Sequence, residues 1–112
     1  MSTILHNLLK LIGTPRDGAL LRYSIGNEYL KQGDTTEALI HLRAAVERDP
    51  NYSAAWKVLG KTLTEAGALQ EALAAYRSGI DVATQSGDRQ AVKEMGVFAR
   101  RLEKQLGTGA DS

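Results

Sequence analysis

Apolar residues return along most of this chain at intervals of three and four positions, which is the spacing of one face of an α-helix. After Asp88, for example, Val92, Met95, Ala99 and Leu102 form one apolar stripe, and the charged residues of this segment fall largely outside it. Earlier stretches of the chain show the same spacing. The pattern predicts an all-α protein.

Residues that stop or start helices separate these stretches. Gly33 and Gly67 each follow an apolar-periodic segment, where glycine commonly ends a helix. Asp34, with Glu37 three positions later, is typical of a capping box that opens a helix. Pro50 pushes the residue before it out of the helical region. We therefore expect helices at about residues 19–32, 34–48, 53–66, 69–85 and 88–106.

The sequence repeats itself when it is shifted by 34 positions. Repetition on the order of 20 to 50 residues is typical of stacked architectures. Each copy holds two of the expected helices, so the repeated unit is a helix pair. Identical pairs under this shift are Gly26 and Gly60, Gly33 and Gly67, Glu37 and Glu71, Ala38 and Ala72, Leu39 and Leu73, and Arg43 and Arg77.

The second copy carries Trp56, Leu59, Gly60, Ala72 and Tyr76, and the first copy follows the same spacing. On these residues the chain resembles the tetratricopeptide repeat family, as a small bacterial-type protein with two repeats and a C-terminal capping helix. The small residues that let paired helices approach closely are present in both copies. The departures from the family pattern are Arg22 for Trp, Leu63 for Tyr, Gly79 for Ala and Thr84 for Pro.

The resemblance implies antiparallel helix pairs in a right-handed superhelical array, within one domain over residues 1–112. Repeat 1 is expected at 19–52, repeat 2 at 53–86, and the capping helix, with a polar outer side, at 88–106. The tail, residues 107–112, is expected to be disordered because almost nothing in it can anchor to a core.

An N-terminal helix is expected at residues 2–12, and three purposes are open for it. It can cap the exposed side of repeat 1, drive self-association, or rest on a membrane surface. It is too short to span a bilayer, which takes roughly 20 apolar residues. Its apolar face consists of Ile4, Leu5, Leu8, Leu9 and Ile12.

In the tetratricopeptide repeat family the first helix of each pair lines a concave surface, so the resemblance implies that outward residues of these helices contact a partner. The cations among them predict a preference for acidic or carboxylate-ended segments. The alternative is that these lysines are solvated and bind nothing specific. The candidate groove residues are Tyr23, Asn27, Lys31, Lys57, Lys61, Lys93 and Arg100.

One branch of the family clamps the C-terminal carboxylate of chaperones with two lysines, two asparagines and one arginine. Asn27 fits that set, but Tyr23 replaces a lysine and Val58 replaces an asparagine. Gln90 and Glu94 stand where the later basic pair belongs. A chaperone-tail clamp is therefore disfavoured.

Composition and motifs exclude several classes of function. The 14 Lys plus Arg nearly balance the 13 Asp plus Glu, so the net charge of +1 provides no field to attract nucleic acid. The absence of cysteine excludes disulfides and thiolate metal sites and favours a cytoplasmic location. His41, expected on the outer convex side of its helix, lacks further metal ligands at suitable spacing. No catalytic or nucleotide-binding motif is present, so neither an enzyme nor a cofactor is expected.

The sequence therefore predicts an adaptor or scaffold that binds a protein or peptide in the groove of the repeats. The alternative is a structural unit that self-assembles into a homo-oligomer through its terminal helices, since two repeats are few for stability alone. Neither the partner nor the pathway follows from the sequence, because such scaffolds carry many unrelated functions.

Overall fold

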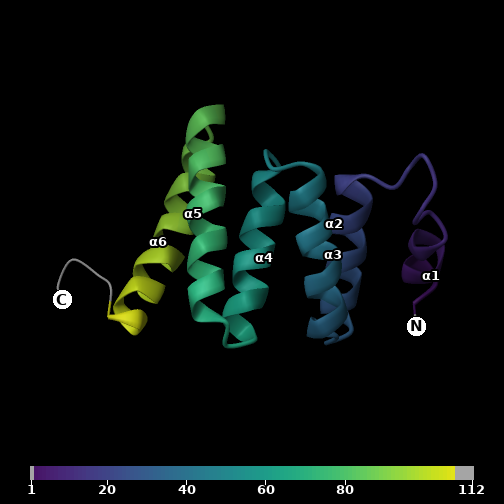
Figure 1. Ribbon diagram of the computed structural model, residues 1–112, viewed down its shortest axis with the longest axis horizontal. Helices are drawn as coiled ribbons and strands as arrows, with labels where there is room; N and C mark the ends of the chain where they lie inside the picture. The colour runs from purple at the N-terminus through teal and green to yellow at the C-terminus, as the bar shows by residue number, and fades with distance from the viewer. Residues whose placement is uncertain (1, 108–112) are drawn as a thin grey trace. The chain divides into compact units, whose positions relative to one another are not determined.

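The computed structural model describes residues 2–107, which form six α-helices and no strand (Figure 1). This confirms the all-α prediction, and the five helices expected from residue 19 onward begin and end within a few residues of the expected positions. The helices are α1 (Thr3–Leu9), α2 (Ala19–Lys31), α3 (Thr35–Arg48), α4 (Ser53–Glu65), α5 (Leu69–Ser86) and α6 (Arg89–Leu106).

The helices fall into two compact units, which are described separately. The first unit reaches Pro50 and contains α1, α2 and α3; the second begins at Asn51 and contains α4, α5 and α6. Within each unit, helices that follow one another in sequence pack side by side (Figure 1). A single domain over the whole chain stays a prediction. The expected disordered tail lies, apart from Gly107, outside the described residues.

The helix ends follow the local sequence signals. Gly33 and Gly67 both have a positive φ, 76° and 81°, which glycine adopts without the steric cost of a Cβ. The Asp34 carboxylate accepts a hydrogen bond from the Glu37 backbone N–H at 3.1 Å, as expected for an N-cap. Only this half of the predicted capping box is present, because the Asp34 N–H donates to the Tyr29 carbonyl instead.

A glycine lies at the crossing of each helix pair. A Cβ added to Gly26 on α2 would lie 2.7 Å from a side-chain carbon of Leu42 on α3. A Cβ added to Gly60 on α4 would lie 2.8 Å from the ring of Tyr76 on α5. Real Cβ atoms do not approach so closely, so both pairs require glycine at these positions. The role predicted for the small repeated residues is thereby confirmed within each pair.

The N-terminal helix α1 covers α2 in the first unit. Leu5 is completely buried and clusters with Leu21 and Ile25 of α2, with further leucine and isoleucine side chains of residues 8–12 packed beside them. Most of the apolar face that could have driven self-association is thus used inside the unit, which favours capping, whereas Ile4 of that face is 58% exposed. The helix ends at Leu9, three residues before the expected end, and continues as turns.

The first unit has a polar centre that the sequence did not predict. His41 was expected on an outer surface but is only 7% exposed, stacked on Tyr29 with ring centroids 5.6 Å apart. Its Nδ1 lies 3.3 Å from a guanidinium nitrogen of Arg22, and Arg22 in turn donates to the Asp17 carboxylate at 2.7 Å. The expectation was wrong because Arg22, where the family has tryptophan, offers His41 a buried polar partner.

The capping helix α6 buries its apolar stripe against α5. Met95 is fully buried and approaches Gly79 of α5, where an added Cβ would lie 2.6 Å from the methionine sulfur. Both acidic residues of α6 pair with neighbouring helices: Glu94 with Lys57 of α4, and Glu103 with Arg77 of α5. Among the described residues, the cations of α6 form no ion pair.

Candidate functional site

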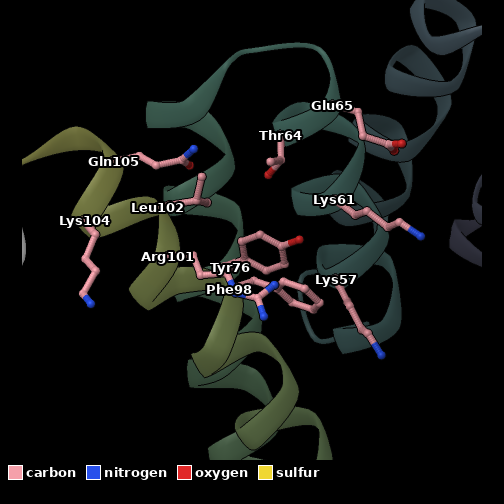
Figure 2. A pocket seen from close by; sticks show the side chains of 10 residues that line it. All are labelled: Lys57, Lys61, Thr64, Glu65, Tyr76, Phe98, Arg101, Leu102, Lys104 and Gln105. Carbon is pink, nitrogen blue, oxygen red and sulfur yellow. The ribbon is translucent and has the colours of Figure 1, made fainter.

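A cavity of about 660 Å³ opens on the second unit, where α4, α5 and α6 come together (Figure 2). This volume is within the usual range for ligand sites, roughly 300 to 1,000 Å³. We call it the aromatic groove. Its lining residues are Lys57, Lys61, Thr64, Glu65, Tyr76, Phe98, Arg101, Leu102, Lys104 and Gln105.

The floor of the aromatic groove is apolar. The rings of Tyr76 and Phe98 are stacked with centroids 5.5 Å apart and lie side by side at the centre of Figure 2. Tyr76 is held there because its ring rests on Gly60, which has no side chain to displace it. Leu102 lies one turn after Phe98 on α6 and completes the floor. Such a floor favours an apolar side chain of a ligand.

Burial defines the chemistry of the Tyr76 hydroxyl. Tyr76 is 2% exposed, and this burial raises its pKa above the ordinary tyrosine value, an effect that a hydrogen bond with Thr64 partly offsets. The phenol is therefore neutral at physiological pH. It can take part in a hydrogen bond at the groove wall, but it supplies neither a phenolate nucleophile nor a base.

Cations flank this floor, with the ammonium groups of the three lysines pointing away from the two rings. Lys57 and Lys61 project from α4, and Arg101 and Lys104 from α6 (Figure 2). The Arg101 guanidinium lies 5.7 Å from the centre of the Phe98 ring, within the range of a cation–π contact. The rim therefore combines positive charge with an exposed aromatic edge.

One of these lysines is already neutralised. The Lys57 ammonium lies 2.6 Å from a carboxylate oxygen of Glu94. Hydrogen bonds from Lys57 and from Gln90 lower the pKa of Glu94, so it stays ionised at neutral pH. Within residues 2–107, Lys61, Arg101 and Lys104 form no ion pair, so these three carry the available charge of the rim.

The structure brings together two of the seven candidate residues. Lys57 and Lys61 line the aromatic groove, as expected from their place on α4. Lys93 lines a different hollow at the turn between α5 and α6, and Arg100 does not line the groove. The neighbouring Arg101 lines it instead. One residue turns a helix by about 100°, so a small error in the alignment of α6 selects the wrong side chain.

The other three candidates lie on α2 in the first unit. Tyr23 and Asn27 are half-buried there, and Lys31 is exposed. The Lys31 ammonium lies 3.1 Å from the Glu28 carboxylate, so part of its charge is compensated on the same helix.

Sequence reasoning missed the floor of the groove. Tyr76 is a core residue, 2% exposed, at a position of the repeat pattern, but Phe98 and Arg101 were not singled out. The usable signal was the i, i+4 pair of Phe98 and Leu102, whose side chains share a face of α6. However, no local feature of the sequence indicates that this face of α6 contacts Tyr76 of α5.

No arrangement of a catalytic or metal centre is found in the described part of the chain. Among residues 2–107, no three His, Asp or Glu side chains are close enough together to hold a metal ion. No helix formed by these residues is long and apolar enough to cross a membrane. The groove offers contact and charge to a ligand.

Comparison with known proteins agrees with the repeated helix pairs. The family model described as tetratricopeptide repeat matches residues 23–87. The chain belongs to the tetratricopeptide repeat family. The TPR repeat-containing protein PA0015 of Pseudomonas aeruginosa is 45% identical over 101 residues, which cover 90% of this chain and 96% of that protein. Proteins of this family commonly act as protein-interaction scaffolds without catalytic activity.

Solved structures of other family members share the fold. Protein BPP2914 from Bordetella parapertussis, known from a solution structure, is 43% identical and superposes with a TM-score of 0.76, covering 94% of this chain and 91% of that one. A tetratricopeptide repeat domain protein from Salinibacter ruber, also solved in solution, is 27% identical with a TM-score of 0.73, covering 79% and 89%. The fold of this tetratricopeptide repeat protein is therefore shared across bacterial relatives.

Proposed function

We infer that this protein is an adaptor that binds a segment of a partner protein in the aromatic groove and prefers acidic segments. The observation that carries the proposal is an apolar floor, formed by Tyr76, Phe98 and Leu102, inside a rim of cations. Apolar surface supplies affinity, and charge selects and orients the partner. A cytoplasmic location remains the prediction from the sequence.

The charges on the rim support an acidic partner. Glu65 is the only carboxylate among the lining residues, against the three unpaired cations Lys61, Arg101 and Lys104, so the described groove is positive overall. Arginine also binds carboxylates with two parallel hydrogen bonds. When Arg101 binds a carboxylate of the partner, the ring of Phe98 stays available for contact with the partner's neighbouring side chain.

The residues on α2 are a further part of this proposal. Tyr23, Asn27 and Lys31 keep the role predicted from the repeat, namely contact with a longer partner segment. Their contribution is separable from that of the aromatic groove, because they belong to the first unit and can be substituted independently.

The proposal is tested by affinity capture from a lysate of the source cells. Wild-type protein is compared with Lys61→Glu/Arg101→Glu, which reverses two charges of the groove rim. The matched control is Lys10→Glu/Arg16→Glu, which makes the same change of net charge at two exposed residues of the first unit. Circular dichroism first checks that all three proteins are equally helical.

Partners captured by the wild type and the control, but lost with the groove variant, are the expected result. The same partner set for all three proteins would contradict binding in the aromatic groove. Loss with both variants would show only a nonspecific response to net charge, which would also count against the proposal.

A further inference from the structure

The capping helix α6 carries a glycine, Gly96, that follows Gly60 by 36 residues and, unlike Gly26 and Gly60, meets no described residue of another helix. In each repeat, the next helix places a side chain against this glycine: Leu42 at 2.7 Å and Tyr76 at 2.8 Å from an added Cβ. At Gly96, an added Cβ would meet only the Arg100 side chain of α6 itself, at 3.5 Å. Within the described residues, the contact made twice before is missing here.

A hollow lies next to this glycine. A cavity of about 750 Å³ opens where α5 ends and α6 begins, and Val92 lines it together with Ala83 and Thr84 of α5. Val92 lies one turn before Gly96 on the same face of α6. Gly96 itself does not line the hollow, but the two lie along one strip of α6, one turn apart, beside which a further helix could lie.

Cations outnumber carboxylates along this strip: Asp88, which also lines the hollow, accepts a hydrogen bond from the Ala91 N–H as the N-cap of α6. Arg89, Lys93 and Arg100 project from α6 within a sector of roughly 60° that includes Gly96, given about 100° per residue. In the described chain none of the three forms an ion pair. Of the two carboxylates of α6, Glu94 pairs with Lys57 of α4 on the far side of the helix. Glu103 lies within about 20° of Gly96 by the same geometry and is paired with Arg77 of α5. We call Val92, Gly96, Arg89, Lys93 and Arg100 the Gly96 face.

We propose that the Gly96 face binds an acidic amphipathic helix of a partner protein. This partner helix would take, beside α6, the position that the second helix of each pair takes beside the first. A large apolar side chain would rest on Gly96, as Tyr76 rests on Gly60, and flanking carboxylates would meet the cations of α6.

Charge and burial disfavour two other occupants. A second copy docked through the same face would bring two sets of three cations together, which repel one another. A membrane would need an apolar face to insert, but the apolar stripe of α6, with Met95 and Leu102, is already buried within the unit.

The inference does not depend on the aromatic groove. Of the residues that line the groove, none belongs to the Gly96 face. A partner could therefore occupy one site while the other stays open, and each site can be disabled by its own substitutions.

The test is a titration of the full chain, uniformly labelled with ¹⁵N, with a capped helical peptide that presents leucines at three- and four-residue spacing and glutamates elsewhere. A second peptide with lysine in place of every glutamate is the matched probe. Backbone amides report the site: Val92 and Gly96 for the Gly96 face, and Lys61 and Thr64 for the groove.

We expect the acidic peptide to shift the amides of Val92 and Gly96, and the basic peptide to shift neither. Gly96→Leu fills the place of the incoming side chain and should weaken binding about tenfold or more. Lys93→Glu/Arg100→Glu should weaken it to a similar extent. The groove variant Lys61→Glu/Arg101→Glu should leave it within about twofold.

Several results would overturn the proposal. They are equal binding of both peptides, shifts confined to Lys61 and Thr64, and unchanged affinity of Gly96→Leu with an unchanged circular dichroism spectrum. A response of the Val92 and Gly96 amides to oligouridine or to phosphatidylserine vesicles, without a response to the acidic peptide, would also overturn it. If Gly96→Leu is less helical than the wild type, the charge-reversal variant decides.

Discussion

The two repeats share one helical frame but fill it with different chemistry. At positions related by the 34-residue shift, the first repeat has Arg22 and His41 where the second has Trp56 and Ala75. The first therefore has a polar network between its helices, in which Arg22 contacts both Asp17 and His41. The second is apolar at the same place, and the Cβ of Trp56 lies against Gly79.

This difference separates anchoring of a neighbouring segment from formation of a groove. In the first unit, the network ties the segment before α2 to the helix pair, because Asp17 precedes α2 and accepts hydrogen bonds from Arg22 and from the Gly13 N–H. In the second unit, the aromatic ring of Tyr76 replaces the smaller Leu42 and reaches Phe98 of α6. The same backbone plan thus serves to hold a neighbouring segment in one repeat and to form a groove in the other.

The largest expected effect comes from the residues that fill the two helix crossings. Tyr76→Ala removes a buried ring and should lower the free energy of unfolding by about 3–5 kcal/mol, and Leu42→Ala should lower it by about 2–5 kcal/mol. Urea denaturation measures both. Leu20→Ala, at a side chain that is 67% exposed, is the control and should stay within about 0.5 kcal/mol. A cost for Tyr76→Ala no larger than the control would show that the crossing is not a packed core.

The glycines should respond with opposite signs. Gly60→Ala pushes a methyl group into the Tyr76 ring, and such overpacking typically costs about 1–3 kcal/mol. Gly96→Ala meets no such neighbour and should stabilise the helix by up to about 1 kcal/mol. Thermal unfolding followed by circular dichroism should give a lower Tm for the first variant and a higher Tm for the second. Shifts of the same sign would refute the distinction between a filled and an open glycine position.

The polar network should make stability depend on pH through groups that the second repeat lacks. Hydrogen bonds from Arg22 and from the Gly13 N–H hold the pKa of Asp17 well below its ordinary range. As the pH falls, Asp17 is therefore protonated in the unfolded chain before it is protonated in the folded protein. Its contribution to the free energy of unfolding is complete above about pH 4 and is lost as the pH falls further. Asp17→Asn should remove this part of the acid dependence of Tm.

His41 should add a second dependence at higher pH. Burial, followed by the neighbouring Arg22 charge, lowers the pKa of His41 below its ordinary value of 6.5. The neutral form is therefore favoured in the fold, and stability should fall as the pH drops below about 6.5. His41→Gln should flatten Tm between pH 7 and 5. Asp81→Asn, an exposed carboxylate of α5, should change neither dependence, and an unchanged profile in His41→Gln would argue against a buried neutral histidine.

The smallest effects are expected for the ion pairs at the surface. Lys31→Ala removes a pair within one helix and should cost less than about 0.5 kcal/mol, because the ammonium is 71% exposed. Arg77→Ala breaks a pair that joins α5 to α6 and should cost up to about 1 kcal/mol. Urea midpoints at low and high salt measure both, and salt should reduce both differences. Larger, salt-independent losses would mean that these side chains contribute through contacts other than charge.

The helix boundaries and the pairing of the helices could largely be predicted, because the sequence signals for them are local or periodic. Glycine and proline mark the helix ends, and the 34-residue shift reveals the glycines at the crossings. The buried position of His41 could not be predicted in this way. It depends on Arg22 and Asp17, which only the fold brings close to His41. Arg22 stands where the family pattern has tryptophan, and its polar side chain is satisfied by Asp17 and His41.

The candidate site could be predicted only in part. Lys57 and Lys61 follow from the repeat, because α4 keeps the register of the family pattern. Among residues 2–107 no helix follows the capping helix to fix its alignment, and its glycine is displaced by two residues from the 34-residue period. Arg100 was therefore selected in place of Arg101, and the partnership of Phe98 with Tyr76 was not visible.

The most direct test of binding in the aromatic groove is an NMR footprint on the full chain of a partner recovered by affinity capture. The account predicts that the amides of Lys61, Thr64 and Phe98 shift or broaden on addition of the partner, and that Lys61→Glu/Arg101→Glu abolishes the response. Changes confined to α3, residues 35–48, with no response from these three amides, would contradict it.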